Sequence, residues 1–421
     1  MTKITDIPAI RFKGFSDTWE QRKVGDLLIE RNQQAPMSDE YPLMAFIANE
    51  GVAQKGDRYD RSALVTDTAN KLYKKTEIGD FIYSSNNLET GSIGLNKYGK
   101  ACISPVYSIF EPTGIADSDF LGRRLVRKDF INAMVKWRQG VIYGQWRIHE
   151  SDFLKIEIPV PSVVEQRKIG AYLDQLDRLI TLHQRKYDKL TNVKKSMLEK
   201  MFPQNGSNVP EIRFKGFTEA WEQRKFDEVF DCTVPNNTLS RAELSYDEGT
   251  VLNVHYGDVL IKYGSVLDVQ KDDIPRIPYR CREDFNGALL QDGDVIIADT
   301  AEDETTGKAC EIGNLQGRAI VSGLHTMVCR PRHRMALGYL GHYLNSNAYH
   351  HQLLPLMQGI KVLSLSRSNI QKTSVSYPTV EKEQQLIANY FSQLDNLITL
   401  HQRELEKLKN LKKACLEKMF V

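Results

Sequence analysis

The stretch "IRFKGFSDTWEQRK" at residues 10–23 decides the layout of this chain, because it returns as "IRFKGFTEAWEQRK" at residues 212–225. Over the slightly longer segments 8–23 and 210–225, twelve of sixteen positions are identical at an offset of 202 residues. Agreement of this length does not arise by chance, and an internal repeat constrains the architecture before any local structure is assigned. We call these two segments the boxes.

A second repeat follows each box. Residues 165–202, "EQRKIGAYLDQLDRLITLHQRKYDKLTNVKKSMLEKMF", return as residues 383–420 at an offset of 218. The regions in between, roughly 24–164 and 226–382, have similar lengths but little sequence in common. This pattern predicts a duplicated frame that carries two divergent domains. The predicted segments are a first domain at 1–164, a helix at 165–202, a linker with the second box and second domain at 203–382, and a helix at 383–421.

The composition is that of a globular protein. A chain of 421 residues is long enough for two or three cores, and 41% hydrophobic with 26% charged residues is ordinary. No apolar run approaches the roughly 20 residues of a membrane span, and the start lacks the apolar core of a signal peptide. The six cysteines are scattered without a Cys-x-x-Cys spacing. We therefore expect a cytoplasmic protein without a membrane segment or a metal site.

The charge gives only local hints of a polyanionic partner. The net charge is +2, which is no overall signature of nucleic-acid binding. Basic runs occur at 71–75, 123–128 and 330–334, whereas the acidic run "DTAEDE" at 299–304 would repel phosphate. Any contact with nucleic acid must therefore depend on parts of the surface.

The second repeats carry an apolar residue at alternating steps of four and three over about five heptads, which predicts coiled-coil helices. Each helix would be roughly 55 Å long. We expect the two to pair antiparallel about a pseudo-twofold axis. The predicted pairing residues are Leu173, Leu176, Ile180 and Leu190 in the first helix and Phe391, Leu394, Ile398 and Leu408 in the second.

Two kinds of polar residue interrupt this seam in both copies. His183 and His401 are interpreted as packing residues, because no cysteine or acidic cluster joins them at ligand spacing. Lys194 and Lys412 are expected to extend their charged ends to solvent.

The two variable regions share a pattern of elements despite their different sequences. Each has a Gly-Asp turn before a β-branched run (78–85 and 292–300), and later an apolar strand that ends in proline. An amphipathic helix is predicted next, around 122–138 and 337–354, followed by a Gln-Gly pair. The pattern predicts two similar domains of the α+β class.

The usual catalytic motifs are missing. "TTGKAC" at 305–310 lacks the Ser or Thr and the upstream glycine of a P-loop, and no Gly-x-Gly-x-x-Gly opens a helix. Neither a Gly-x-Ser-x-Gly elbow nor a His-Glu-x-x-His pair is present. An Asn-Pro-Pro-Tyr motif of amino-methyltransferases is also missing. The sequence therefore predicts a protein that is not itself an enzyme.

Duplicated "IRFKGF…WEQRK" boxes, two unlike regions and two "EQ…LD.LI…HQR" helices resemble the specificity (S) subunit of type I restriction–modification systems. The likeness covers essentially the whole chain, and the paired order makes it specific. In that family each variable region is a target recognition domain that reads one half of a split double-stranded DNA site. The repeated helices hold the domains apart, set the spacer and dock two modification (methyltransferase) subunits.

The resemblance also implies where the chemistry occurs. S-adenosylmethionine binds the modification subunits, and ATP with Mg is used by separate restriction (endonuclease/translocase) subunits, so this chain would carry no cofactor. The methylated base is usually adenine N6. We therefore predict a non-catalytic DNA-recognition subunit.

Reading base edges requires Arg, Lys, Asn, Gln, Ser or Thr side chains that reach a groove. The candidates in the first region are Ser84, Ser85, Asn86, Asn87, Thr90, Ser92, Tyr143, Gln145 and Arg147. Those in the second are Lys262, Tyr263, Thr305, Thr306, Lys308, Lys361, Ser364 and Arg367. Trp19 and Trp221 in the boxes are interpreted as packing residues.

A second hypothesis stays open at this point. A coiled-coil scaffold that joins protein partners without touching nucleic acid would explain the near-neutral charge. DNA binding at low and high salt, with and without modification subunits, separates the two hypotheses.

Overall fold

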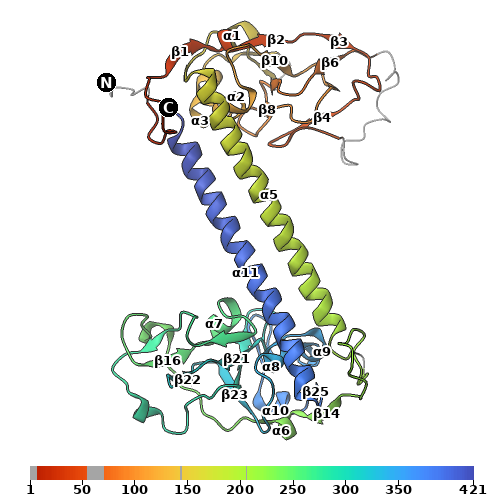
Figure 1. The fold of residues 1–421 in the computed structure, drawn as a ribbon, viewed down its shortest axis with the longest axis vertical. Coiled ribbons are helices and arrows are strands. Elements are labelled where there is room, and N and C mark those ends of the chain that lie inside the picture. Colours follow the sequence, from red (N-terminus) through yellow and green to blue (C-terminus); the bar gives the residue numbers. More distant parts are fainter. Residues whose placement is uncertain (1–6, 55–70, 143–144, 205) are drawn as a thin grey trace. The chain divides into compact units, whose positions relative to one another are not determined.

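A computed structural model describes residues 7–54, 71–142, 145–204 and 206–421 of the chain (Figure 1). Its contacts divide the chain into two compact units. Unit 1 combines residues 1–183 with residues 404–421, and unit 2 comprises residues 184–403. Each unit therefore contains one variable region and one segment of each long helix.

Unit 1 is built on a four-stranded antiparallel sheet with the strand order β2-β10-β7-β8. Its strands are β2 (Leu28–Glu30), β10 (Ser108–Pro112), β7 (Phe81–Tyr83) and β8 (Ile93–Leu95). Two smaller sheets contain β3 (Gln34–Ala35), β6 (Tyr73–Thr76) and β9 (Ala101–Ile103), and β4 (Ala45–Ile47) with β5 (Gly51–Ala53). Stacked aromatic rings of Phe81, Tyr83, Phe110 and Phe153 fill the core, the last from α4 (Glu150–Phe153).

Unit 2 repeats this sheet and extends it. Its order is β15-β23-β19-β21-β17, where the first four strands correspond to those of unit 1 and β17 is added in parallel to β21. The strands are β15 (Phe230–Asp231), β23 (Thr326–Pro331), β19 (Val295–Ala298), β21 (Ala309–Gly313) and β17 (Val266–Asp268). A second sheet contains β18 (Arg276–Ile277), β16 (Val251–Val254) and β22 (Ala319–Ser322). The predicted α+β class is confirmed, as are the strands that follow the Gly-Asp turns and the strands that end in proline.

The single helix predicted after these strands is wrong in both units. Unit 1 has two short helices, α2 (Ser118–Arg124) and α3 (Lys128–Val135), and unit 2 has α8 (Tyr339–Leu344) and α9 (Asn347–His350). In unit 2 the amide of Asn345 donates to Gly341 O at 2.7 Å and the hydroxyl of Ser346 to Tyr343 O at 2.6 Å. Such bonds from side chain to backbone compete with continuation of the helix.

The boxes are paired with the strands that lead into the long helices. In unit 1, β1 (Glu20–Lys23) lies antiparallel to β13 (Glu157–Val160), and in unit 2, β14 (Glu222–Lys225) lies antiparallel to β25 (Ser374–Tyr377). A short helix follows each box strand, α1 (Val24–Leu27) or α6 (Phe226–Val229). The box thus joins the two ends of each variable region.

A buried ion pair fastens each box to its helix. Arg11 donates from Nε and Nη2 to the two carboxylate oxygens of Glu165, both at 2.7 Å, and Arg213 holds Glu383 in the same way at 2.7 and 2.8 Å. The hydrogen bond to the carboxylate raises the pKa of each arginine. These contacts explain why the arginine of each box and the first glutamate of each helix repeat are both retained in the two copies.

The box tryptophans are buried, which confirms their interpretation as packing residues. Trp19 and Trp221 are each 3% exposed. Trp19 packs edge-on against Phe120, and Trp221 against Tyr339, with ring centroids 5.7 and 6.1 Å apart.

The long helices are α5 (Val163–Lys200) and α11 (Glu381–Lys418), and both units pair them. Asp177 of α5 bonds Lys412 of α11 in unit 1, and Lys194 of α5 bonds Asp395 of α11 in unit 2. The partners follow opposite orders along the two helices, so the helices run antiparallel. Of the predicted pairing residues, Leu173, Leu176 and Leu408 join one core in unit 1, whereas Leu190, Phe391 and Leu394 join another in unit 2. Ile180 and Ile398 are half-buried.

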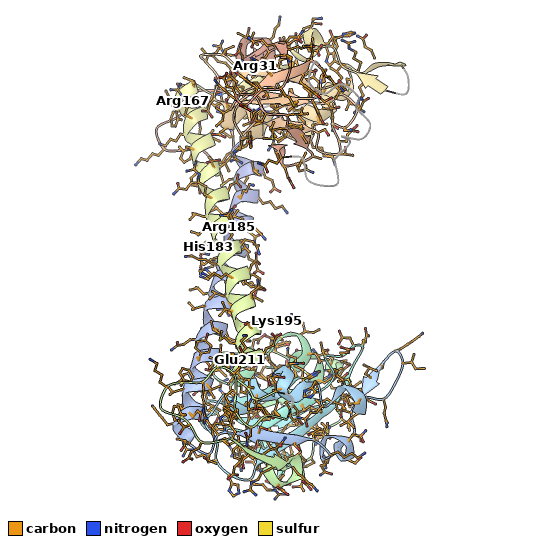
Figure 2. All side chains as sticks on the ribbon, turned by 90° about the vertical axis from the view of Figure 1, so that its right-hand side faces the viewer. Arg31, Arg167, His183, Arg185, Lys195 and Glu211 are labelled. Atoms are coloured by element: carbon orange, nitrogen blue, oxygen red, sulfur yellow. The ribbon has the colours of Figure 1, made fainter. Side chains whose placement is uncertain are left out.

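The expectation for the seam lysines is wrong. Lys412 Nζ lies 2.5 Å from Asp177 Oδ1 in unit 1, and Lys194 bonds Asp395 in unit 2. The charged ends therefore cross to the other helix instead of extending to solvent. His183 (Figure 2) and His401 are half-buried on α5 and α11. Among the described helices, none is long and apolar enough to cross a membrane.

Candidate nucleic-acid interface

The first cluster of candidates lies on the loop 84–92, between β7 and β8 of unit 1. Backbone bonds close the loop, from Ser84 N to Ser92 O at 2.8 Å and from Ser92 N to Asn87 O at 2.9 Å. Ser84 and Ser92 are buried, Ser85 and Asn86 are half-buried, and Asn87 and Thr90 are exposed. The loop therefore presents only part of the predicted set to solvent.

The second cluster of unit 1 lies beside this loop, on the hairpin of β11 (Gln139–Ile142) and β12 (Gln145–Arg147). Arg138 at its base donates to both carboxylate oxygens of Glu89, at 3.0 and 2.7 Å, and lowers the pKa of that carboxyl. Ser85 Oγ accepts a bond from Ile148 N at 3.1 Å. Loop 84–92 and the hairpin thus form one surface.

The remaining candidates of unit 1 belong to this hairpin. Arg147 is exposed at the end of β12, opposite Gln139. Gln145 is described only by its place in β12, and Tyr143 lies outside the described residues.

The corresponding elements of unit 2 also lie together. β20 (Thr300–Ala301) pairs antiparallel with β24 (Leu363–Ser364), which follows the second Gln-Gly pair. Thr306 is buried, and its hydroxyl bonds Asp303 O at 3.0 Å. The exposed candidates of this surface are Thr305, Lys361, Ser364 and Arg367, the last at the start of α10 (Arg367–Ile370).

Three further candidates of unit 2 are engaged within the fold around α7 (Tyr256–Ile261). Lys308 Nζ donates to Leu260 O at 2.8 Å and Tyr263 O at 3.2 Å, and burial lowers the pKa of this lysine. Tyr263 is 3% exposed, and burial raises its pKa. Lys262 bonds Asp273 at 2.8 Å. A role of these three residues in DNA binding stays a prediction.

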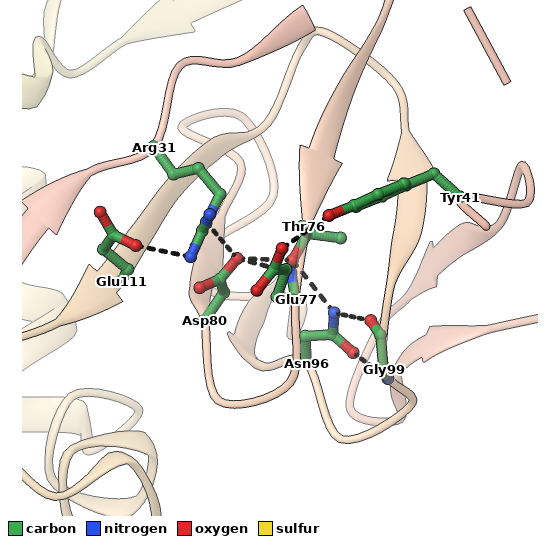
Figure 3. A network of polar contacts seen from close by, with 8 residues as sticks. All are labelled: Arg31, Tyr41, Thr76, Glu77, Asp80, Asn96, Gly99 and Glu111. Atoms are coloured by element: carbon green, nitrogen blue, oxygen red, sulfur yellow. Dashed lines mark hydrogen bonds and ion pairs between the residues drawn. The ribbon is translucent and has the colours of Figure 1, made fainter. Parts of the chain in front are cut away.

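A buried polar network supports the strand that carries loop 84–92 (Figure 3). Asp80, 1% exposed and directly before β7, lies 2.9 Å from Arg31 Nε and accepts Glu77 N at 2.7 Å. Arg31 also bonds Glu111 at 2.6 Å. Burial raises the pKa of Asp80, while Glu77 N and Arg31 act in the opposite direction. The Gly-Asp turn is predictable from the sequence, but the partners of Asp80 are not.

Unit 2 has the equivalent carboxylate with another partner. Asp294, directly before β19, receives Arg330 Nε at 2.8 Å and Nη2 at 2.7 Å. It also accepts Gln291 N at 2.8 Å. In both units, the strand that leads to the candidate surface therefore begins directly after a buried acid.

Among the described residues, the candidate surfaces contain no cluster of side chains that could bind a metal. Within the described ranges, no group of three or more His, Cys, Asp or Glu side chains could hold an ion. What the two surfaces offer is hydroxyls, amides and cations on loops, which suits hydrogen bonding to a polar partner.

Comparison with known proteins gives consistent matches. The family model described as type I restriction modification DNA specificity domain matches twice, at residues 16–192 and 218–410. The type I restriction enzyme MjaVIII specificity subunit of Methanocaldococcus jannaschii is 22% identical over 416 residues, covering 94% of this chain and 91% of the relative. The crystal structure of the type I restriction-modification S subunit from M. genitalium has a similar fold, with a TM-score of 0.54, 14% identity and 99% of both chains covered.

Proposed function

The chain belongs to the type I restriction modification DNA specificity family, and we propose that it is the DNA sequence-specificity subunit of such a restriction–modification complex. The observation that carries the proposal is the repeated frame with two different surfaces. The two units have corresponding sheets, and in each the box strand pairs with the strand that leads into a long helix. Their exposed loop residues differ. Two unlike surfaces on one frame suit two unlike halves of one DNA site.

Each unit would read one half-site through its paired loop and hairpin. The unit 1 surface combines loop 84–92 with Arg147, and the unit 2 surface combines Thr305 with residues 361–367. Such hydroxyl, amide and guanidinium groups bond base edges in the major groove. The antiparallel helices would set the separation of the half-sites, since half-sites recur with the helical turn of about 34 Å.

The partners follow from this role. Two modification subunits would dock on the repeated helices, where Leu182 in unit 1 and Leu400 in unit 2 are equivalent and 46% and 51% exposed. Those subunits would bind S-adenosylmethionine, and restriction subunits would use ATP and Mg. The chain itself would take part in no chemical step and would act in the cytoplasm, where its DNA substrate lies.

Exchange of one variable region tests the proposal. Residues 24–164 are replaced by the matching region of a relative with another target, and the methylated sites of the complex are mapped by sequencing. We expect one half of the bipartite site to change and the other half to be retained. The matched control exchanges residues 226–382 and should change the opposite half.

Two results would count against the proposal. A change in both halves on either exchange would mean that the units are not independent readers. A complex that assembles on the helices but binds no DNA at low salt would favour the protein scaffold instead.

A further inference from the structure

A short hairpin in unit 2 is closed tightly at its base. Gln358 and Ser364 bond each other in both directions, with N to O distances of 3.0 and 2.8 Å, and Ser364 Oγ also donates to Gln358 O at 3.3 Å. The chain reverses over residues 359–363. We call residues 358–364 the tip hairpin.

A glycine is required for this turn. Gly359 has φ +128°, and a Cβ at this position would lie 1.9 Å from the carbonyl oxygen of Val362. No side chain fits such a distance, and φ in this range is strained for any other residue. Any other residue at position 359 would therefore force this turn to change.

The base of the tip hairpin is attached to the core. β24 pairs with β20, and the next residue, Leu365, donates its N–H to Asp299 O at 2.8 Å. Leu365 is 4% exposed and belongs to the core of unit 2. The hairpin thus presents its tip from a fixed support.

Two apolar side chains of the tip hairpin point to solvent. Ile360 is 99% exposed and Val362 is 51% exposed, with Lys361 between them. A single exposed apolar residue is common and marks nothing by itself. Here two exposed apolar residues follow Gly359 in one tight turn. The fold therefore keeps both side chains in solvent and away from the core of unit 2.

The neighbours of the tip indicate what it contacts. Residues 302–304, Glu-Asp-Glu, leave the β20–β24 pairing at the same end as the tip and are exposed. These carboxylates repel phosphate but can accept a hydrogen bond from the amino group of cytosine. The surface therefore suits base edges better than the DNA backbone.

We propose that the tip hairpin enters the major groove of one half-site and that Ile360 contacts the 5-methyl group of a thymine. This deepens the proposed function and rests on it. Among base edges in the major groove, the thymine methyl is the apolar group, and apolar side chains recognise it by contact. Ile360 would then determine specificity for thymine at one position.

Deoxyuridine tests the contact directly, because it differs from thymidine only by that methyl group. The complex of the full chain with its modification subunits is bound to duplexes in which each thymine of the half-site assigned to unit 2 is replaced singly. We expect one replacement to weaken binding by the wild-type complex about fourfold, the effect of one buried methyl-sized group. Ile360→Ala should bind both duplexes equally, with the affinity of the wild type for the uracil duplex.

Ile261→Ala is the matched control. Ile261 belongs to the same unit, is 89% exposed and ends α7, away from the tip hairpin in sequence. This variant should discriminate thymine from uracil as the wild type does. Because both side chains are exposed, both variants should keep the thermal unfolding midpoint.

Other outcomes overturn the inference. A half-site without thymine, a wild type indifferent to every replacement, or an Ile360→Ala complex that still discriminates would each do so. If the Ile360→Ala chain fails to bind modification subunits but still recognises DNA normally, the tip hairpin contacts a protein subunit and not DNA. Loss of DNA binding by the wild-type complex would instead contradict the proposed function.

Discussion

Each unit has a buried aspartate at an equivalent position, and the arginine that pairs with it comes from a different part of the sheet in each unit. Asp80 in unit 1 directly precedes β7, and Asp294 in unit 2 directly precedes β19. Arg31, which follows β2, bridges Asp80 and Glu111, whereas Arg330 of β23 reaches Asp294 directly. A buried charge must be paired, but its partner can come from any neighbouring strand. Divergence after the duplication therefore kept the acid and exchanged the arginine.

The contacts between the helices differ in a similar way. In unit 1, Asp177 binds two cations, Arg123 at 2.9 Å and Lys412 at 2.5 Å. Both cations hold the pKa of Asp177 below its usual value, although burial opposes them.

The equivalent Asp395 of unit 2 has one cation. It bonds Lys194, while His342 replaces Arg123 with Nδ1 3.9 Å away. Burial lowers the pKa of His342 to about 3, so this histidine is neutral at pH 7. The frame is thus shared, but its electrostatic support is weaker in unit 2.

The largest expected effect comes from deleting the second half. A fragment ending at Gln204 lacks residues 404–421, which supply Leu408, Lys412, Cys415, Met419 and Phe420 to unit 1. A second copy can supply the equivalent residues, Leu190, Lys194, Met197, Met201 and Phe202. We expect an isologous dimer. Sedimentation should give twice the fragment mass, and the complex should methylate a symmetric, interrupted palindrome.

Phe202→Ala sharpens this prediction. In the dimer Phe202 would take the place of Phe420, which stacks on Phe120 at 5.3 Å in unit 1. The variant should dissociate at higher protein concentration than the unchanged fragment. A folded, stable monomer of the fragment would contradict the equivalence of the two helices.

Breaking the ion pair between box and helix should have the next largest effect. Glu165→Ala in unit 1 and Glu383→Ala in unit 2 each leave a mostly buried arginine unpaired, which costs about 3 kcal/mol of unfolding free energy. Glu383 also accepts Trp221 Nε1 at 3.3 Å, so its loss should cost about 0.5–1 kcal/mol more. Urea unfolding followed by tryptophan fluorescence measures both.

The exposed Glu20 provides the control for this pair of variants. It belongs to the first box and bonds only Arg22 at the surface among the described contacts. Glu20→Ala should leave the urea midpoint almost unchanged. Equal midpoints for all three variants would refute a structural role of the box arginines.

Glu311 of unit 2 occupies the position of Leu95 in unit 1. We therefore expect the unfolding free energy of unit 2 to depend on pH in a way that unit 1 does not share. The Glu311 carboxylate accepts Gly341 N at 2.8 Å, and burial raises the pKa of Glu311 to about 7. The folded state therefore keeps this proton up to about pH 7, while the unfolded chain releases it near its usual pKa of 4.5. Between these values the folded state binds more protons, so the unfolding free energy falls as pH rises.

Glu311→Gln removes this titration and keeps the side-chain shape. We expect the fall, about 2.5 kcal/mol between pH 4.5 and 7, to disappear in the variant. Thermal unfolding at intervals of half a pH unit measures it. A wild type and a variant with parallel pH profiles would contradict the prediction.

The smallest expected effect is the difference in stability between two lysine variants, one at each contact between the long helices. Lys194→Ala leaves Asp395 beside a neutral histidine and should cost about 1.5 kcal/mol, whereas Lys412→Ala leaves Asp177 with Arg123 and should cost about 0.5 kcal/mol. Unfolding in urea gives both values, and a double-mutant cycle of Lys194 with Asp395 isolates the pair. If Lys412→Ala proves the more costly, Arg123 does not support Asp177.

Much of the fold could be predicted from residues whose environment is local or repeated. The heptad spacing located both long helices, and the Gly-Asp turns located β7 and β19, because spacing and turn chemistry act within a few residues. The split of the predicted helix was missed because Asn345 and Ser346 bond the preceding turn only once that turn exists.

The candidate DNA-contacting residues were less predictable than the frame. Polar residues after the Gly-Asp strands were named from their type, yet Lys308 donates to backbone carbonyls and Thr306 is buried. Ile360 was not named, because an isoleucine in a sequence predicts a core position until its exposure is known.

The sequence by itself determined the duplication, the two helices, the α+β class and the resemblance, because repeats and periodicities are properties of order along the chain. Only the tertiary structure decided which side chains pair. Arg11 with Glu165, Arg31 with Asp80 and Lys412 with Asp177 join residues that are far apart in sequence. Such pairs depend on how strands and helices pack. An arginine can meet a buried acid from any strand that passes within its reach, so spacing along the chain does not reveal the partner.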